Sequence, residues 1–297
     1  MLTEIQRLVR RHARPDLTTA VDGLLLSRVD RQTEPDHSLA EPLLVLMAQG
    51  GKELFLGDRS FGYRAGDYLL VTTDLPVTGQ FVDATPEAPA LGIGIRLRPA
   101  VIAALLLEAP LHAALRSAAP ALAVGRAGPE LLDAVLRLLR LLERPGDVAV
   151  LAPMLEREIL WRVLTGPHGP VLRQIGLADS TLTHVGLAIR WIRDHHAEPL
   201  RIEELARRAA MSSSAFHRHF RAVTAMSPVQ FQKRIRLQRA RSLLLTSPGD
   251  VAGAGHAVGY DSPSQFSREY RRLFGAPPGR DVAALRVAGP AVERALP

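Results

Sequence analysis

The sequence predicts an α+β fold, in which a strand-rich N-terminal region precedes a C-terminal region made only of helices. Three observations lead to this prediction. Short apolar runs alternate with turn residues up to residue 97, leucines take helical spacing after residue 99, and a pair of helices is repeated after residue 184. A period of two residues favours strands and a period near 3.6 favours helices. The 297 residues suffice for two domains of ordinary size.

The strand region extends from about residue 17 to residue 97. Its runs are apolar or alternating, and clusters rich in glycine, aspartate or proline separate them. The runs are residues 43–49, 52–56, 68–73, 77–82 and 91–97. Short strands at a spacing of roughly ten residues are typical of a small barrel or sandwich.

The N-terminus predicts a short surface helix rather than a signal peptide. Leu2, Ile5, Leu8 and Val9 have helical spacing, and arginines occupy the other face. No apolar run approaches the roughly 18 residues that span a membrane. The sequence contains no cysteine, which excludes disulfides and thiolate metal sites and favours a reducing compartment. We therefore expect a cytoplasmic protein without membrane contact.

Helical spacing replaces the strand pattern after residue 99. Leucines and a valine recur at three- and four-residue steps from Leu131 to Leu142, and Pro145-Gly146 ends the run. A second helix is expected at about residues 148–164. The spacing leaves two roles open, because an apolar helix face can cover the strand region or pair with a second subunit.

Residues 200–228 predict two short helices joined by a tight turn, which is a helix-turn-helix motif. Ser212 can cap the second helix, which we call the reader helix. Phe216 and Phe220, four residues apart, form its buried stripe. Its exposed positions hold side chains that can contact base edges and phosphates. They are Ser214, His217, Arg218 and Arg221.

The same pattern occurs a second time. Residues 250–258 predict a weak helix, and residues 262–275 predict a second reader helix in which Phe266 and Tyr270 repeat the aromatic pair. Residues 227–248 predict one long helix between the motifs. About 19 helical residues span ~28 Å, close to the ~34 Å between successive major-groove segments of DNA.

Positive charge is concentrated in this C-terminal region. Residues 184–285 hold 16 Lys and Arg against 8 Asp and Glu, whereas the rest of the chain holds 21 against 22. Such an excess is typical of a nucleic-acid-binding module. Charge alone leaves a solvated basic face as an equal alternative, and the repeated motif favours DNA.

Residues distributed over the whole of 184–285 match one family pattern. They are Leu205-Ala206, Met211-Ser212, Phe216, Arg218, Phe220, Ser227-Pro228, Arg236, Leu237, Arg239-Ala240, Leu243-Leu244, Val258-Gly259-Tyr260, Phe266, Arg268, Leu273-Phe274-Gly275 and Pro277. With these residues, the stretch resembles the DNA-binding domain of the AraC/XylS family. Residues 49–81 and 84–97 resemble the N-terminal domain of one branch of that family, which has a cupin-like barrel followed by helices.

The resemblance implies a cupin-like β-barrel with flanking helices, followed by an all-α domain with two helix-turn-helix motifs. The expected parts are an effector-binding and dimerisation domain (1–166, with the barrel at about 17–97 and helices at about 99–165), a linker (167–183), the DNA-binding domain (184–285) and a tail (286–297).

The resemblance further implies a sequence-specific DNA-binding regulator of transcription, controlled by a small molecule bound in the barrel. Base-facing residues are expected at Ser214, His217, Arg218, Ser264, Gln265, Ser267 and Arg268. Phosphate contacts are expected from Arg221, Arg234, Arg271 and Arg272. The expected partners are double-stranded promoter or operator DNA, the effector and a second copy of the chain, with RNA polymerase as a further candidate.

If one of the two possible faces of each strand is taken to point inward, the strands predict a set of side chains that line the effector pocket. A shift of one residue exchanges the inward and outward sets. The set is Leu46, Phe55, Tyr68, Leu70, Thr72, Phe81, Ile93 and Ile95.

The second motif departs from the family pattern at Ala252-Gly253-Ala254-Gly255, where the family places an aliphatic residue and an alanine. Each glycine lowers helix stability by about 1 kcal/mol relative to alanine, and a missing aliphatic side chain lowers it further. We therefore expect the second motif to be less stable than the first, and Arg218 to be a firmer base contact than Arg268.

Two alternatives to an effector-controlled regulator remain. One is a regulator whose barrel only dimerises, and the other is a small-molecule enzyme with a basic accessory domain. The enzyme is disfavoured because the strand runs offer few titratable groups. No cofactor or metal is expected. Residues 253–259 resemble a dinucleotide-binding loop, but they follow a basic helix rather than a buried strand, which argues against a nucleotide site. The strand region holds one histidine, His37, which is too few for a metal site of the cupin type. His217 and His219 point to different faces of their helix, so they cannot easily bind one metal ion.

Overall fold

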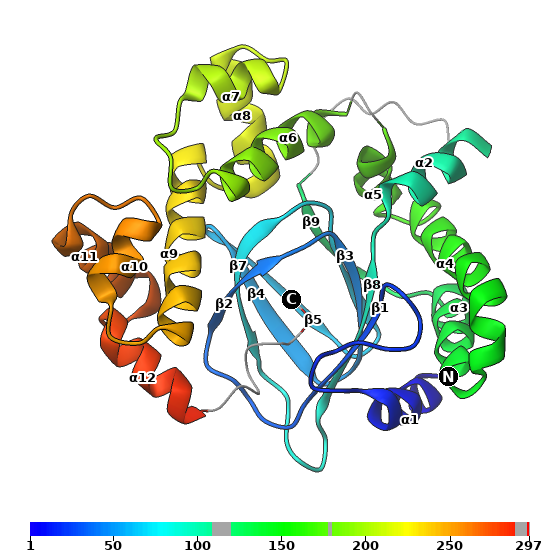
Figure 1. Cartoon of the computed structure of the whole chain (residues 1–297). Helices are drawn as coiled ribbons and strands as arrows, with labels where there is room; N and C mark the ends of the chain where they lie inside the picture. Colours follow the sequence, from blue (N-terminus) through cyan, green and yellow to red (C-terminus); the bar gives the residue numbers. More distant parts are fainter. Residues whose placement is uncertain (109–119, 178–179, 289–295, 297) are drawn as a thin grey trace.

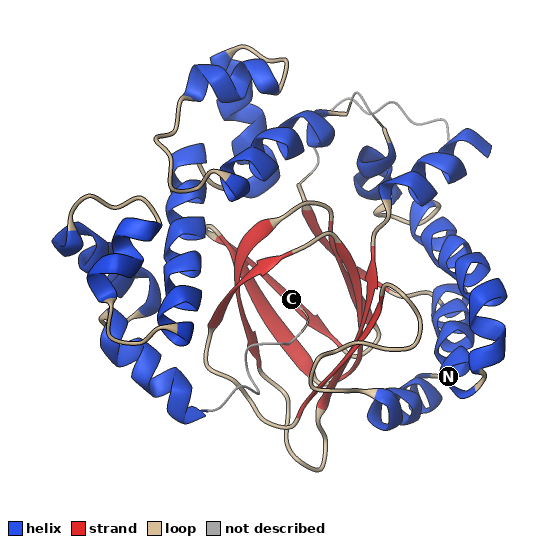
Figure 2. Cartoon of the chain, in the orientation of Figure 1, coloured by secondary structure: helices blue, strands red, loops and turns tan. Residues whose placement is uncertain are grey.

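A computed structural model describes residues 1–108, 120–177, 180–288 and 296, and it confirms the α+β fold class. Strands occupy the middle of the molecule, and helices lie on both sides of them (Figures 1 and 2). The elements of the N-terminal domain are α1 (Leu2–His12), β1 (Leu24–Val29), β2 (Asp36–Ala40), β3 (Leu43–Gln49), β4 (Gly51–Leu56), β5 (Arg59–Arg64), β6 (Asp67–Val71), β7 (Leu75–Phe81), β8 (Ala90–Arg96), α2 (Pro99–Glu108), β9 (Leu122–Arg126), α3 (Pro129–Arg140), α4 (Val148–Leu164) and α5 (Gly169–Gly176). The helices that follow are α6 (Thr181–Asp194), α7 (Ile202–Arg208), α8 (Ser213–Thr224), α9 (Pro228–Thr246), α10 (Val251–Ala257), α11 (Pro263–Phe274) and α12 (Pro278–Ala288).

The strands within the described residues form two antiparallel sheets. The five-stranded sheet has the order β1-β8-β3-β6-β9, and the four-stranded sheet has the order β2-β7-β4-β5. The two sheets share no strand, so the region consists of two open sheets rather than a closed barrel. Residues from both sheets, among them Val45, Met47, Leu54 and Val77, pack together in one core.

The five predicted strand runs correspond to β3, β4, β6, β7 and β8. The strands that the pattern did not single out are β1, β2, β5 and β9, and all four lie at a sheet edge. An edge strand has one neighbour and tolerates polar residues, as β5 does with mostly exposed side chains. Its apolar signal is therefore weaker than that of a central strand.

The helices α1, α3 and α4 cover the outer face of the five-stranded sheet. Leu26, Leu46, Leu70 and Ile93 point to these helices and share one buried cluster with them. The prediction of helices near 129–142 and 148–164 is confirmed by α3 and α4. An apolar helix face could cover the strand region or pair with a second subunit, and the buried leucines of α3 do the first.

The stretch 167–183 was expected to be a linker, but part of it is the helix α5. Val171 and Leu172 are buried in the cluster on the outer face of the five-stranded sheet, so α5 belongs to the N-terminal domain by its packing. Pro170 stands in its first turn, where a missing N–H is tolerated. Gly169 and Pro170, which lie in the expected linker, therefore mark the start of a helix.

The C-terminal region consists of two helix-turn-helix motifs joined by α9. The motifs are α7 with α8 and α10 with α11, and α9 spans 19 residues between them. The capping box of α9 satisfies two backbone N–H groups, because Ser227 and Gln230 each accept from the other's backbone. Among the described residues, no helix is both long enough and apolar enough to cross a membrane.

Candidate nucleic-acid interface

The first reader helix is α8, and its own sequence determines where it begins and which face is buried. The Ser212 hydroxyl accepts a hydrogen bond from the Ala215 N–H at 3.3 Å, which caps the N-terminus. Phe216 and Phe220 are fully buried, and the Phe220 ring meets Phe231 of α9 edge-on at 5.5 Å. The aromatic pair thus holds α8 against α9 and turns the opposite face outward.

That opposite face carries the four predicted DNA-facing side chains of α8. Ser214, His217, Arg218 and Arg221 are all exposed, as predicted. Their spacing of three, one and three residues places them along one face of the helix. Within the described ranges, none of the four side chains makes a hydrogen bond or an ion pair with another side chain. They are therefore available to a partner.

The second reader helix, α11, repeats this construction. Ser262 caps it through the Gln265 N–H at 3.3 Å, and Phe266 and Tyr270 are fully buried. The Tyr270 hydroxyl donates to Asp281 of α12 at 2.7 Å. This bond ties α11 to α12 and, with burial as the larger cause, raises the pKa of the Tyr270 phenol.

The exposed side chains of α11 divide into free and engaged groups. Arg268, Arg271 and Arg272 are exposed and make no ion pair with any described residue. The Gln265 amide donates to Glu269 at 3.1 Å, and the hydroxyls of Ser264 and Ser262 lie 3.0 Å apart. Ser267 is only partly exposed. The arginines are thus the freest predicted contacts of the second motif.

Gly255 has a packing role that the sequence pattern did not reveal. A Cβ atom at this position would lie 3.0 Å from the ring of Phe266. The helix α10 therefore packs so closely on α11 that an alanine here would require the Phe266 ring to move by a few tenths of an ångström. The Asp250 carboxylate caps α10 by accepting from the Gly253 N–H at 2.7 Å, so the helix forms despite its two glycines.

The arginines of α9 do not all belong to the interface. Arg236 donates to the carbonyl oxygens of His196, Ala197, Glu198 and Gly259 at 2.6, 3.1, 3.0 and 2.7 Å. It is a structural group that joins α9 to the chain after α6 and to the turn of the second motif. Burial lowers the pKa of its guanidinium.

Arg234 was predicted to contact phosphate, and the structure separates it from the free arginines. It is partly buried, and burial lowers its pKa. Gln238 and Arg241, four and seven residues further along α9, bond to Ser38 and Asp36 of β2. Arg234 shares that helix face, which is turned toward the N-terminal domain, and it would reach phosphate only if that contact opened.

The contact between the two domains is built around β2. Arg241 pairs with Asp36 at 3.0 Å and with Asp281 of α12 at 2.8 Å. The His37 ring meets Phe274 of α11 edge-on at 4.8 Å. Burial lowers the pKa of His37 to about 4, so this ring is neutral at pH 7. The second motif is thus docked on the four-stranded sheet.

The residues predicted to line the effector pocket do not lie together. They are divided between the outer face of the five-stranded sheet and the space between the two sheets. Leu46, Tyr68, Leu70, Ile93 and Ile95 belong to the cluster beneath the helices, on the outer face. Phe81 lies in the cluster between the sheets, Phe55 is partly exposed, and Thr72 is buried against Ala121. The chosen register was therefore wrong for an interior pocket at the five outer-face positions.

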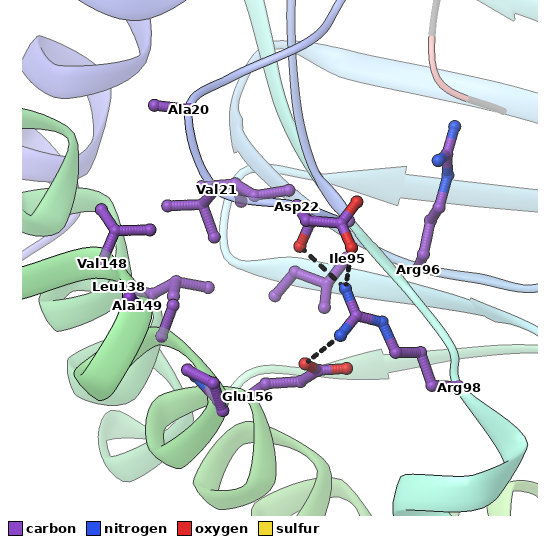
Figure 3. A pocket seen from close by; sticks show the side chains of 14 residues that line it. Ala20, Val21, Asp22, Ile95, Arg96, Arg98, Leu138, Val148, Ala149 and Glu156 are labelled. Atoms are coloured by element: carbon purple, nitrogen blue, oxygen red, sulfur yellow. Dashed lines mark hydrogen bonds and ion pairs between the residues drawn. The ribbon is translucent and has the colours of Figure 1, made fainter. Parts of the chain in front are cut away.

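A cavity of about 220 Å³ lies outside the five-stranded sheet, between the start of β1, the end of β8 and the helices α3 and α4 (Figure 3). Its wall includes Ile95 of the predicted set. Figure 3 shows the Arg98 guanidinium between Asp22 and Glu156, at 2.8 and 3.3 Å. Burial raises the pKa of Glu156.

The N-terminal domain and the helix-turn-helix motifs both match known protein families. A family model described as the N-terminus of AraC-type transcriptional regulators matches residues 20–171, just over half of the chain. The chain belongs to the AraC family. A second model, described as a helix-turn-helix domain, matches residues 205–283, which hold both reader helices of this AraC-type protein.

Curated relatives of this AraC-type protein include the HTH-type transcriptional activator RhaS. RhaS of Escherichia fergusonii is 32% identical over 163 residues, which cover 51% of this chain and 56% of the relative. RhaS of Salmonella agona is 29% identical over 160 residues, covering 53% and 56%. The match therefore spans little more than half the length of these relatives.

Among solved structures, ToxT from Vibrio cholerae shares the fold. Wild-type ToxT with a bound unsaturated fatty acid matches with a TM-score of 0.55 at 10% identity, covering 88% of this chain and 95% of ToxT. ToxT bound to (E)-4-(8-methylnaphthalen-1-yl)but-3-enoic acid matches with a TM-score of 0.54 at 10% identity, covering 89% and 100%. The likeness extends over both domains.

Proposed function

We propose that this AraC-type protein binds specific duplex DNA through α8 and α11 and regulates transcription in response to a small molecule. The observation that carries the proposal is the face of α8 at Ser214, His217, Arg218 and Arg221, which is exposed and has no partner within the described residues. Hydrogen-bonding and cationic side chains on one helix face fit base edges and phosphates.

The proposed contacts follow from position and chemistry. Ser214, His217 and Arg218 stand in the first half of α8, where a reader helix meets the bases in a major groove. Arg221, Arg271 and Arg272 lie closer to the helix ends and suit phosphates. Arg268 corresponds to Arg218, and Ser264, Gln265 and Ser267 are secondary base contacts, since their side chains are engaged or partly covered.

We propose that the N-terminal domain senses the effector and forms a homodimer. Apolar side chains on α2 and α4 support the dimer, because Leu107, Val150 and Met154 are 86%, 67% and 62% exposed. Exposed apolar groups on two helices that contact each other favour a protein partner. The carboxylic acids bound to ToxT support an effector of that class. RNA polymerase is a further proposed partner.

We propose a role in binding rather than catalysis, and a cytoplasmic location where chromosomal DNA is accessible. Membership in a family of transcriptional regulators supports both proposals. If the N-terminal domain only dimerises, DNA binding will not respond to any small molecule.

The test begins with DNA selected by the purified full-length protein from a random pool, followed by footprinting. Arg218→Ala should weaken binding to the selected site by about 1–3 kcal/mol and relax specificity at one position. Arg31→Ala removes an exposed arginine of the N-terminal domain and serves as the matched control. An unchanged footprint and affinity for Arg218→Ala would contradict the assignment of α8.

A further inference from the structure

Lys52 is buried between the two sheets, and no carboxylate of the described residues makes a hydrogen bond with its ammonium group. It is one of two lysines in the sequence, and it is 6% exposed on β4. Its Nζ donates to the backbone carbonyl oxygen of Leu296 and lies 4.4 Å from the centre of the Phe81 ring. Burial lowers the pKa of Lys52 to about 7, and the charge of Asp36 opposes this shift. A buried cation of this kind favours an anionic partner.

Leu296 occupies the space beside Lys52. It is 3% exposed and belongs to the core between the sheets. A Cβ atom on Gly94 would lie 2.7 Å from Leu296 Cδ2, and one on Gly92 would lie 3.3 Å from Cδ1. A Cβ atom on Gly79 would lie 2.9 Å from Lys52 Cε. Glycines on both sheets thus leave room for an isobutyl group and a lysine side chain.

We propose that this space is a ligand site for a short, branched aliphatic carboxylate, and that Leu296 occupies it when the ligand is absent. A leucine residue without its backbone nitrogen has the carbon skeleton of 4-methylpentanoate. The carboxylate of such a ligand would take the place of the Leu296 carbonyl on Lys52 Nζ, and its methyl groups would lie against Gly92 and Gly94. The inference rests on the proposed function and specifies its effector.

Charge favours the carboxylate over the carbonyl that it displaces. The ammonium group already makes a charge-assisted hydrogen bond to the carbonyl oxygen, and a carboxylate would make the acceptor ionised as well. A buried ammonium also gains a counter-charge that a peptide carbonyl does not supply. A neutral molecule of the same shape, such as 4-methylpentan-1-ol, offers no such gain and should bind weakly.

The cavity in Figure 3 is a poorer site for the same ligand. Its cation, Arg98, already pairs with Asp22 and Glu156. A carboxylate entering there would meet two carboxylates and a neutralised guanidinium. Lys52 differs because Asp36, the acid whose charge acts on it, is itself paired with Arg241 at 3.0 Å.

The presence of only two lysines gives a direct measurement. In full-length protein labelled with ¹³C at lysine Cε, Lys52 and Lys233 give two signals, and the signal lost in Lys52→Met identifies Lys52. Addition of 4-methylpentanoate should shift the Lys52 signal and leave that of Lys233, whose Nζ pairs with Glu269 at 2.7 Å. Equal concentrations of 4-methylpentan-1-ol should shift neither.

Variants separate the ligand site from the competing residue. Leu296→Gly should bind the acid about tenfold more tightly by calorimetry, because removing an intramolecular competitor raises the fraction of open sites. Lys52→Met should lose at least about tenfold in affinity. Arg98→Ala, in the other cavity, should bind like the wild type.

Two results would overturn the proposal. One is a Lys52 signal that the acid leaves unmoved in both the wild type and Leu296→Gly. The other is a Leu296→Gly affinity no tighter than that of the wild type. The wild-type and Leu296→Gly measurements decide the matter even if Lys52→Met fails to fold. Footprinting of the same proteins without ligand tests the DNA-binding proposal separately.

Discussion

Single side chains in this protein owe their roles to what surrounds them rather than to their type. Arg218 on α8 is exposed, whereas the guanidinium of Arg236 on α9 donates hydrogen bonds to four backbone carbonyl oxygens. The two lysines differ in the same way, since Lys52 is buried between sheets and Lys233 lies in a surface ion pair. Two measurements test these assignments at the level of the residue.

Arg271→Ala should weaken binding to all DNA sequences alike. Arg271 is exposed near the end of α11 and is proposed to contact a phosphate. Each phosphate contact contributes about 0.9 to the slope of log K against log salt concentration. A salt titration of affinity should show that slope reduced by about this amount, and an unchanged slope would remove Arg271 from the phosphate set. Arg31→Ala is the control.

The stability of the protein should rise with pH through the range set by Lys52. Its pKa is lowered from 10.5 to about 7 in the fold, so the unfolded chain binds more protons between these values. The free energy of unfolding should therefore increase by up to about 1.4 kcal/mol per pH unit across that range. Urea unfolding at pH 7 to 9.5 should show this rise in the wild type and in Lys233→Met, and lose it in Lys52→Met.

At the scale of the element, both helix-turn-helix motifs need left-handed backbone at their turns, and they use different residues there. The first motif places Ala210 and Ala225 in the left-handed region, with φ of 51° and 58°. The second motif uses Gly259 and Gly275, with φ of 87° and 81°, at the corresponding turns. Glycine adopts this conformation without the steric penalty that alanine carries. The second motif is therefore less strained at its turns than the first.

Gly255→Ala should destabilise the second motif although alanine is the better helix former. The new methyl group would press on the Phe266 ring from 3.0 Å. Overpacking costs about 1–3 kcal/mol, which outweighs the ~1 kcal/mol gained in helix propensity. Thermal unfolding should show a net loss of about 1 kcal/mol. Gly279→Ala is the matched control because its Cβ meets open space, and a gain in Gly255→Ala would refute the packing role.

At the scale of the whole molecule, the N-terminal domain holds the second motif through a polar contact. Arg241 connects Asp36 of β2 with Asp281 of α12, and Asp281 in turn accepts from Tyr270 of the second reader helix. Asp36 also lies close enough to Lys52 to influence its charge. This arrangement links the space between the sheets to the second reader helix through neighbouring charges.

Asp36→Asn should loosen the contact between the domains and leave the Arg241–Asp281 pair in place. The Asp36 side chain is 31% exposed, so the loss should be about 1–2 kcal/mol, below that of a fully buried pair. Amide hydrogen exchange in β2 should then accelerate roughly tenfold. Asp30→Asn removes a surface pair with Arg28 and should leave β2 unchanged. Equal exchange in both variants would show that the ion pair does not hold the domains.

Met154→Glu should convert the proposed dimer to a monomer in sedimentation equilibrium. Met154 is 62% exposed on α4, and a charge there is incompatible with an apolar interface. Leu243→Glu makes a similar change at a position 42% exposed on α9 and should keep the wild-type mass. If Met154→Glu sediments like the wild type, α4 is not the dimer surface.

The sequence by itself determined the features that depend on neighbours a few residues away. Caps at Ser212 and Ser262 and aromatic pairs four residues apart identified both reader helices and their exposed faces, since these signals lie within one or two helical turns. The central strands were also predictable, because burial leaves nearly continuous apolar runs in β3, β6 and β8 and alternating runs in β4 and β7.

Only the tertiary structure decided the features that depend on distant partners. The edge strands, the inward set of each sheet and the direction of the α9 arginines follow from contacts across many residues, and a shift of one residue exchanges the faces of a strand. The helical pattern of α9 did not distinguish Arg234, which faces β2, from an arginine facing solvent. Likewise, the pairing of Lys52 with Leu296 joins residues 244 positions apart, a separation over which local periodicity carries no information.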